Sequence, residues 1–358
     1  GYPRTGDLAR VSAVTAPDDS TVVIRFSVRP RGLPDVLTDL AILPAHLLDT
    51  VPHDRLRSAE WNEHPVGNGP FRFVAHDPHR RWVFVRNPDF PADLGGPPQL
   101  ARFIVVVVDE STAKLAALEG GELDFAGINA AHVAFVRRDP RLAVLDYPTI
   151  FPYGIVFNTR RPPFDDRAVR LAALLAIDRP EIVAGYAFGF AEVADGPVPP
   201  GEPGYLPVAR VPFAPESARR LLAGRHPAVE LLTVGSGEAA LEQMIQARLA
   251  AVGFRVTIRQ LENGAFVDRV YGPRHEFTAA VTGIAGDPGL GYLAPIGALT
   301  GIPVPDDPAA AQRLFARELP VAWLYHPRGV NGMNRRIRGV RMDLRGELAT
   351  VSRWEATP

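Results

Sequence analysis

Proline and glycine recur along this whole chain, and they limit the length of every regular element. The 358 residues include 36 prolines and 32 glycines. Proline interrupts helices and sheets and glycine favours turns, so this spread favours many short strands and helices. The longest purely aliphatic run, Ile104 to Val108, is long enough for a strand and far too short to span a membrane.

Two strand–helix–strand patterns and one hairpin pattern predict an α/β fold with parallel units and antiparallel hairpins. The continuous apolar run Phe103–Val108 predicts a strand buried on both faces, because its consecutive residues are all apolar. The other predicted strands are Thr21–Ser27, Phe71–Val74, Trp82–Arg86, Leu123–Ala126, 229–234 and Phe254–Leu261. The predicted helices are Ser111–Glu119, 167–176, Pro180–Tyr186, 216–224, Leu241–Val252 and Pro308–Arg317.

Short carboxylates mark the starts of two of these helices. Asp165 or Asp166 can accept the first free backbone N–H groups of the helix 167–176. Asp178 and Glu181 form a capping-box-like pair before the next helix. The adjacent Asp165 and Asp166 are therefore interpreted as cap and dipole partners, and not as an acid–base pair.

The charge and the lack of cysteine exclude several classes of function. Lys+Arg 39 against Asp+Glu 40 gives a net charge of -1, which removes the electrostatic basis for binding nucleic acid or an acidic membrane surface. Without any cysteine, the chain has no disulfide, thiolate metal site or cysteine nucleophile. His76 and His79 flank a proline in a predicted hairpin turn, which favours a solvated turn over a metal site.

One segment has the layout of a dinucleotide site. Gly235, Gly237 and Ala240 follow a predicted strand and open a predicted helix, and Glu262 closes the next strand. In a nucleotide-binding enzyme the glycines admit a pyrophosphate and the acid binds the ribose. A parallel strand–helix–strand unit without a nucleotide also needs a tight turn of small residues here, so the motif alone does not distinguish the two interpretations. Ser236 lies outside a nucleophile-elbow pattern, and no base is placed for it.

Eight segments occur in the order and form typical of one protein family. They are ILPAHLL (42–48), HPVGNGPFRFVAHDPHRRWVFVRNPDF (64–90), GGELDFAGI (120–128), FNTRRPPFDDRAVRLAALLAIDRPEIV (157–183), GPVPP (196–200), MIQARLAAVGFRV (244–256), TGIAGDP (282–288) and LPVAWLYHP (319–327). On these motifs the chain resembles family 5 of the extracytoplasmic solute-binding proteins. Members of that family are the peptide, nickel and oligopeptide receptors of ABC importers.

The resemblance implies an α/β, two-lobed periplasmic-binding-protein-like fold of type II, with the ligand enclosed between hinged lobes. It implies that 1–153 forms a partial first lobe, 154–321 the second lobe, and 322–358 a return to the first lobe. The first lobe is expected to be incomplete, because the chain begins at a strand that follows a substantial N-terminal region in relatives. The stretch 290–318 is shorter than in relatives and leaves Pro308–Arg317 as its candidate helix.

The same resemblance implies the substrate-binding component of an ABC importer, which binds a peptide or other small solute and delivers it to membrane permease subunits. It implies no catalytic residue, no metal and no cofactor, no nucleic-acid partner, a monomeric state and a periplasmic or extracytoplasmic location. Neither a signal peptide nor a lipid anchor is present at Gly1. Two alternatives stay open, namely an enzyme that binds a nucleotide cofactor at Gly235–Glu262 and a truncated relic that binds nothing.

The resemblance also indicates where a ligand would bind. Peptide-binding relatives carry an aspartate three positions before the closing Asp-Pro, where it pairs with a peptide α-ammonium, but here that position is Ile284, while Asp287 is kept. A buried ammonium without a partner is unstable, so an uncharged or apolar ligand fits better. Ile284→Asp is expected to weaken folding little and to shift the ligand preference towards amines. The candidate ligand-binding residues are Tyr153, Asn158, Glu262, Thr282, Ile284 and Asp287.

Overall fold

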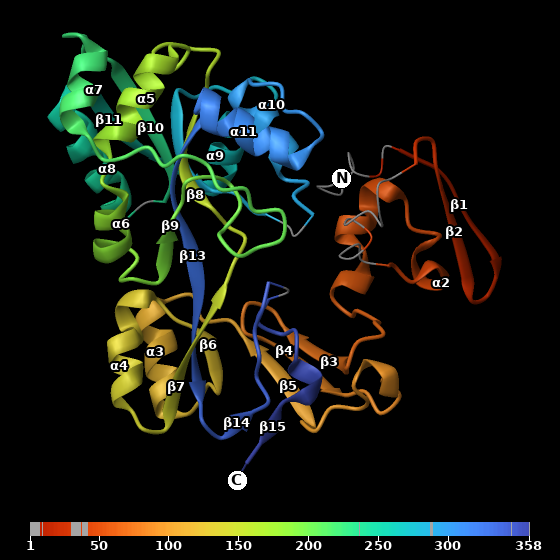
Figure 1. The fold of residues 1–358 in the computed structure, drawn as a ribbon. Coiled ribbons are helices and arrows are strands. Elements are labelled where there is room, and N and C mark those ends of the chain that lie inside the picture. Colours follow the sequence, from red (N-terminus) through yellow and green to blue (C-terminus); the bar gives the residue numbers. More distant parts are fainter. Residues whose placement is uncertain are drawn as a thin grey trace. The chain divides into compact units, whose positions relative to one another are not determined.

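The computed structural model describes residues 8, 10–29, 37, 42–235, 237–286, 289–344 and 346–357. The chain forms two compact units (Figure 1). Unit 1 comprises Gly1–Ile42, Ile150–Ile177 and Ala194–Leu324, and unit 2 comprises Leu43–Thr149, Asp178–Val193 and Tyr325–Pro358. Both mix helices and strands, as the sequence predicts for an α/β chain. Among the described residues, no helix combines the length and the apolar character that crossing a membrane requires.

The central sheet of unit 1 combines parallel and antiparallel strands. Its strands lie in the order β11, β10, β12, β8 and the start of β13. Strands β10, β11 and β12 run parallel, and β8 is antiparallel to β12. The bounds are β8 Tyr153–Phe157, β10 Ala228–Val234, β11 Arg255–Leu261, β12 Ala279–Gly283 and β13 Val321–Asn334, with a separate hairpin of β1 Val11–Asp18 and β2 Thr21–Phe26.

Helices cover both faces of this sheet (Figure 1). Helices α5, α7 and α8 pack against one another on one face, and α9, α10 and α11 contribute to the core on the other. That core includes Leu232, Phe266, Ile296 and Trp323, all almost fully buried. The bounds are α5 Arg167–Ala176, α7 Pro215–Leu222, α8 Ala240–Val252, α9 Asn263–Val270, α10 Leu293–Thr300 and α11 Pro308–Glu318.

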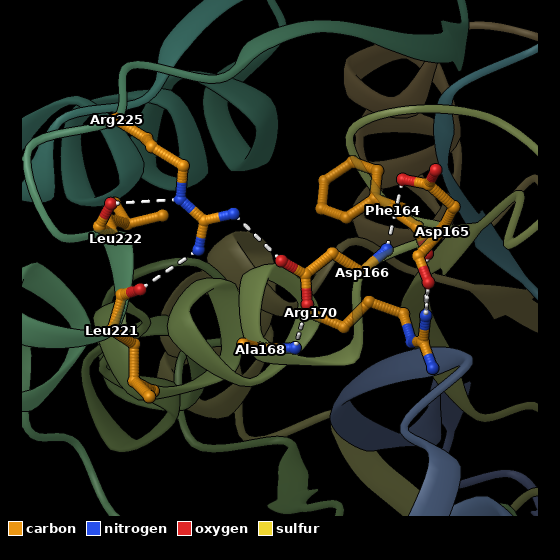
Figure 2. Close-up of polar contacts among 8 residues, drawn as sticks. All are labelled: Phe164, Asp165, Asp166, Ala168, Arg170, Leu221, Leu222 and Arg225. Carbon is orange, nitrogen blue, oxygen red and sulfur yellow. Dashed lines mark hydrogen bonds and ion pairs between the residues drawn. The ribbon is translucent and has the colours of Figure 1, made fainter.

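Two arginines make hydrogen bonds at the start of α5: Arg225, which lies outside the helix, and Arg170, which lies within it (Figure 2). Asp166 caps the helix by accepting a hydrogen bond from Ala168 N–H (2.8 Å), and its other carboxylate oxygen binds Arg225 (2.8 Å). The buried Arg170 donates to the carbonyl oxygens of Phe164 (2.7 Å) and Glu318 (3.0 and 2.8 Å). The predicted cap is confirmed, and Arg170 links the helix to the end of α11.

Unit 2 has a small sheet around the second half of β13. Strands β6 and β7 are antiparallel to it, and β9 pairs with its residues Tyr325–Pro327. Leu118, Val136 and Leu142 form the core between this sheet and the helices. The bounds are α2 Ala45–Leu48, α3 Ser111–Gly120, β6 Phe125–Gly127, α4 Val133–Arg138, β7 Leu142–Pro148, α6 Arg179–Gly185 and β9 Ala191–Val193. Short 3-10 helices are His53–Ser58, Glu60–Asn62, Ala92–Leu94, Ala130–His132 and Val351–Arg353.

A second sheet of unit 2 consists of β3, β4 and β5 in that order, all antiparallel. The predicted hairpin is confirmed, with β3 Phe71–Asp77 and β4 Arg81–Arg86. Its third strand is β5 Arg102–Val106, and a short pair of β14 Ile337–Arg338 and β15 Glu355–Ala356 lies near the C-terminus. Trp354 is buried and its ring contacts those of Phe103 and Phe125.

Two sequence predictions differ from the structure. The prediction that Phe103–Val108 is buried on both faces is wrong, because Ile104, Val105, Val106 and Val107 are each between 42% and 46% exposed. Strand β5 lies at the edge of its sheet, so burial from a second neighbouring strand is absent within the described residues. The helix α10 was not predicted, since the Pro-Ile-Gly sequence inside it disfavours a helix; packing of its apolar side chains stabilises it.

The division into units also differs from the predicted lobes, since Gly1–Ile42, predicted in the first lobe, groups with unit 1. The chain leaves unit 2 between Thr149 and Ile150, and it returns between Leu324 and Tyr325, close to the predicted crossings. Residues 178–193, predicted within the second lobe, group with unit 2. The lobe boundaries 1–153, 154–321 and 322–358 stay a prediction.

Candidate functional site

Most of the predicted ligand-binding residues lie along one edge of the unit 1 sheet. Strands β10, β11 and β12 are parallel, so their carboxyl ends share an edge. Strand β8 runs in the opposite direction, and its first residue Tyr153 pairs with Gly283, the last residue of β12. Thr282 therefore lies beside Gly154, while Ile284 and Glu262 follow directly after β12 and β11. In open α/β sheets, ligands bind at the carboxyl ends of strands.

The pairing of β8 and β12 continues past both strands into the loops at this edge. Ile284 N–H donates to Pro152 O (3.0 Å), and Gly286 N–H donates to Ile150 O (2.8 Å). Glycine allows this close approach, because a Cβ on Gly283 would overlap the Phe151 ring and one on Gly286 would overlap Ile150. The loop before β8 is thereby held flat against the loop after β12.

An aromatic pair occupies this edge. The Phe151 and Tyr153 rings lie 5.7 Å apart in an edge-to-face arrangement, and Phe151 is 37% exposed. Sequence reasoning singled out Tyr153 and missed Phe151, although Pro152 between two aromatic residues was a usable signal. A half-exposed aromatic pair beside a glycine provides an apolar, flat surface that a solute can pack on.

Ile284 is part of the core as well as of the edge. Its side chain is 9% exposed and belongs to the cluster that includes Leu290 and Tyr292. A carboxylate at this position would be buried without a partner in the described structure. This burial argues against the expectation that Ile284→Asp weakens folding little, since desolvation of the charge opposes folding, and the effect of the substitution stays a prediction.

Thr282 and Glu262 both make local hydrogen bonds. Thr282 Oγ1 donates to Gly283 O (3.1 Å). Glu262 caps α9 by accepting a hydrogen bond from Gly264 N–H (3.1 Å) and is exposed. Strand β11 is separated from β12 by β10, which places Glu262 about 10 Å from the end of β12 at one strand spacing per step.

Asn158 lies at the opposite edge of the sheet, after the last residue of β8. Its side-chain amide donates to the carbonyl oxygens of His275 (2.9 Å) and Phe277 (3.0 Å), and its oxygen accepts from Arg160 N–H (3.2 Å). These bonds satisfy the buried amide and fix the segment before β12. The structure thus separates Asn158 from the other candidate residues. Asp287 lies outside the described residues, so its ligand contact stays a prediction.

The dinucleotide alternative loses much of its geometric basis. Strands β10 and β11 and helix α8 form the expected parallel unit, but α8 begins at Ala240, several residues after β10 ends, and no side chain caps it. The Glu262 carboxylate is already engaged at α9. Ser236 lies outside the described residues. Within the described ranges, no three histidine or acidic residues are grouped to hold a metal ion.

Comparison with known proteins identifies a common family. The model of bacterial extracellular solute-binding proteins, family 5 Middle, matches residues 1–301. A putative ABC transporter peptide-binding protein of Brucella ovis is 29% identical over 78% of this chain and 55% of its own length. Di/tripeptide-binding protein 2 of Pseudomonas aeruginosa is 31% identical over 71% of this chain and 50% of its own. The chain spans about half the length of these curated relatives.

Solved structures of similar proteins have the same fold. The oligopeptide-binding protein AppA from Bacillus subtilis, solved with a nonapeptide, has a TM-score of 0.81 at 21% identity, covering 99% of this chain and 80% of its own. The ABC transporter substrate-binding protein CtaP from Listeria monocytogenes has a TM-score of 0.84 at 17% identity, with 99% and 80% covered. The predicted periplasmic-binding-protein-like α/β fold is thereby confirmed.

Proposed function

Since the chain belongs to family 5 of the bacterial extracellular solute-binding proteins, we propose that it is the substrate-binding component of an ABC importer. In this proposal it binds a peptide or another small solute outside the cytoplasm and delivers it, as a monomer and without catalysis, to a membrane permease. The names of the two relatives, a peptide-binding and a di/tripeptide-binding protein, support a peptide-like solute.

The observation that carries the proposal is the edge of the unit 1 sheet. Tyr153, Thr282 and Ile284 converge there from β8 and β12, although more than a hundred residues separate Tyr153 from the other two. The exposed Phe151 ring adds apolar surface, and the hydrogen bonds between the two loops hold that surface in place. Preformed apolar surface with a few polar groups is typical of solute sites.

The same edge favours a ligand that is not anchored by its ammonium group. Ile284 provides an apolar side chain where the family resemblance implies a carboxylate in peptide-binding members, and Glu262 lies two strands away and caps a helix. We therefore propose that packing on Phe151 and Tyr153, together with backbone hydrogen bonds, replaces an ion pair to the ligand amine.

Native mass spectrometry of gently purified protein tests the function directly, because a co-purified solute identifies the ligand class. Calorimetric titration with a tripeptide and its N-acetylated form then tests the anchoring. Because no ion pair is proposed to hold the ligand amine, the two Kd values should lie within about threefold of each other. Loss of such an ion pair on acetylation would weaken binding well over tenfold. Absence of any bound solute, together with no binding of either peptide, would refute the proposal.

Two variants locate the site. Phe151→Ala and Tyr153→Ala should each weaken binding about tenfold or more, as expected for loss of an aromatic contact. Tyr271→Ala is the matched control. Tyr271 is a similarly exposed aromatic residue that follows the last residue of α9, at the end of that helix opposite Glu262. Equal weakening by all three variants would place the ligand elsewhere.

A further inference from the structure

The turn between α6 and β9 of unit 2 displays aromatic side chains. Tyr186 and Phe188 are 40% and 53% exposed, and Phe190 is partly buried. A phenyl ring left half in water forgoes much of the free energy that burial would provide. Aromatic residues at alternate positions of one short turn form a concentrated apolar surface, which is typical of an interaction site.

Backbone hydrogen bonds hold this turn in place from both ends. Gly189 N–H donates to Val183 O (2.9 Å), which ties the turn to α6. Phe190 O accepts from Arg328 N–H (2.9 Å), which ties the end of the turn to β13. The rings are therefore presented on a fixed support. A partner that binds them pays little conformational entropy for ordering the turn.

Phe188 has a backbone conformation that its own unit does not explain. Its φ of 50° lies in the left-handed region, which glycine adopts freely and a residue with a Cβ adopts only at a cost. Because the ring is half exposed, packing within the unit does not compensate for this strain. Backbone strain that displays an exposed ring indicates a role for that ring in an interaction.

Helix α4 adds positive charge beside this turn. The guanidinium carbon of Arg137 lies 5.7 Å from the centre of the Phe190 ring, a cation–π contact that joins the helix to the turn. The guanidinium carbon of Arg138 lies 5.6 Å from the centre of the Phe135 ring, which is 51% exposed. Both arginines are themselves exposed. Aromatic rings and arginines are thus neighbours on the surface of unit 2.

The charges of these two arginines have no counterpart in the part of the chain that the structure describes. Neither Arg137 nor Arg138 forms an ion pair there, and the carboxylate of the neighbouring Asp139 is bound by Arg141 (2.7 Å). An arginine that lies over an aromatic ring keeps N–H groups available for a carboxylate, which it can bind through parallel hydrogen bonds. The surface is therefore suited to an anionic group from outside the unit.

We propose that this surface docks the membrane permease of the importer, through a permease segment that presents carboxylates beside an apolar side chain. The inference rests on the proposed function, which requires such a partner. Aromatic residues and arginine are enriched at protein interfaces, where a few of them provide most of the binding energy. The aromatic–arginine surface consists of Phe135, Arg137, Arg138, Tyr186, Phe188 and Phe190.

Two other occupants match this surface less well. A symmetric contact between two copies of this chain would place two positive surfaces against each other, which opposes association. An acidic bilayer attracts proteins through clusters of basic residues, whereas the chain as a whole has a net charge of -1. Carboxylates on a protein complement two arginines held beside rigid aromatic rings.

Peptide uptake by cells tests the aromatic–arginine surface. In a bacterial strain whose own copy of the gene is deleted, plasmid-borne variants are compared by their initial rate of uptake of a labelled tripeptide. Phe188→Gly and Arg137→Glu should each lower that rate by about tenfold or more, as expected for loss of an interface anchor. The Kd of the purified variants for the same tripeptide should stay within about twofold of the wild-type value, because both residues lie in unit 2, away from the sheet edge of unit 1.

Phe188→Gly also separates docking from stability. Glycine adopts the left-handed conformation without strain, which offsets the freedom it adds to the unfolded chain, so the melting temperature should stay within about 2 °C. Phe213→Ala is the matched control. Phe213 in unit 1 is 42% exposed and has the Arg248 guanidinium carbon 5.5 Å from its ring centre, but its φ is not positive. This variant should leave uptake unchanged.

The remaining outcomes would overturn the proposal. Unchanged uptake with both Phe188→Gly and Arg137→Glu would exclude docking at this surface. Uptake lost together with tripeptide binding would mean that the surface acts on the solute or on folding. Binding of the purified chain to phosphatidylglycerol vesicles that Arg137→Glu abolishes would assign the surface to lipid, and a dimer that Phe188→Gly dissociates would assign it to a second copy.

The wild-type gene distinguishes a failure of this inference from a failure of the proposed function. If the wild-type gene restores no uptake and its product binds no tripeptide, the proposed function is refuted and the docking with it. If the wild-type gene restores uptake and the two variants restore it equally well, the inference alone is refuted.

Discussion

Each unit contains a strand–helix–strand segment, and the two segments end in different environments. In unit 1, β10 and β11 flank α8 and pair over seven positions, from Ala228 with Arg255 to Val234 with Leu261, and β12 covers the other edge of β10. In unit 2, β5 and β6 flank α3 without pairing with each other. Leu232 of β10 is fully buried, whereas Ile104 of β5 is about half exposed.

The difference shows that an apolar run predicts a strand more reliably than it predicts burial. Phe103–Val108 is continuously apolar, and β10 is apolar except for Glu230 and Thr233, so composition alone favours burial of β5 at least as strongly as burial of β10. The burial of β10 comes from two neighbouring strands and from helices on both faces. Strand β5 has one neighbouring strand within the described residues.

The largest expected contrast is between Leu232→Ala and Ile104→Ala. Leu232→Ala should lower the free energy of unfolding by about 3 kcal/mol, because it opens a cavity in a closed core. Ile104→Ala should lower it by less than about 1 kcal/mol, since the side chain is already half hydrated. Urea unfolding measures both, and equal losses would show that the β5 edge is covered in solution.

The next contrast concerns arginines. Arg170→Ala should destabilise unit 1 by about 2 kcal/mol, because the carbonyl oxygens of Phe164 (Figure 2) and of Glu318 lose a donor in a buried place. Arg336→Ala in unit 2 should cost less than about 1 kcal/mol, since its ion pair with Asp124 is about half exposed. Thermal unfolding of the two variants compares them, and a larger effect of Arg336→Ala contradicts this account.

A smaller effect depends on pH. The hydrogen bond from Arg225, followed by that from Ala168 N–H, holds the pKa of Asp166 below its usual 3.8. A lowered folded-state pKa stabilises the protein above the unfolded value, and this contribution disappears as the pH falls through the lowered pKa. Asp166→Ala should cost about 1 kcal/mol at neutral pH. The cost should begin to shrink below about pH 4, where the unfolded state binds the proton, and should vanish only below the lowered folded-state pKa, where both states bind it.

Unfolding of this variant and of Asp165→Ala at neutral and acid pH gives the comparison. The Asp165 carboxylate accepts only the Asp166 N–H among the hydrogen bonds identified, at 3.0 Å, and Asp165 lies one position outside the cap. A pH-independent loss for Asp166→Ala would mean that the carboxylate charge does not matter at the start of α5.

The smallest expected effect is a shift in the pKa of one tyrosine in unit 2. Burial, and then the nearby Glu347 carboxylate, raises the pKa of Tyr147 to about 12. A raised folded-state pKa means that the stabilisation is complete below the ordinary value of 10 and is lost as the pH rises towards 12. Ultraviolet absorbance should show one late-ionising tyrosine that Tyr147→Phe removes. Glu347→Gln should move it only part of the way back, because burial is the larger cause.

Local features of the sequence determined much of the secondary structure. The helix 167–176 was predicted at its observed bounds, and Asp166 and Asp178 cap the helices that they precede. Gly121 and Gly253 end α3 and α8 in left-handed conformations. Caps and turns depend on residues within a few positions, so the sequence carries them directly.

The role of an individual side chain depended on partners far along the chain. Asn158 was predicted to bind ligand, but carbonyl groups more than a hundred residues away hold its amide. Ile284 was predicted beside the ligand, and its side chain packs in the core while its backbone lies at the edge. The position of the motifs predicted which region of the sheet holds most of the candidate residues. The direction of each side chain could be assigned only from the strand register in the structure.

The sequence by itself determined the family, the α/β class and the order of strands and helices, because motifs, periodicity and caps are short-range properties of the chain. The tertiary structure alone decided that α10 is a helix despite Pro295 and Gly297, that β5 is exposed, and that residues 178–193 belong with unit 2. Burial and strand pairing depend on segments that are distant in sequence, and a local sequence pattern does not specify which of these segments will pack against an element or pair with it.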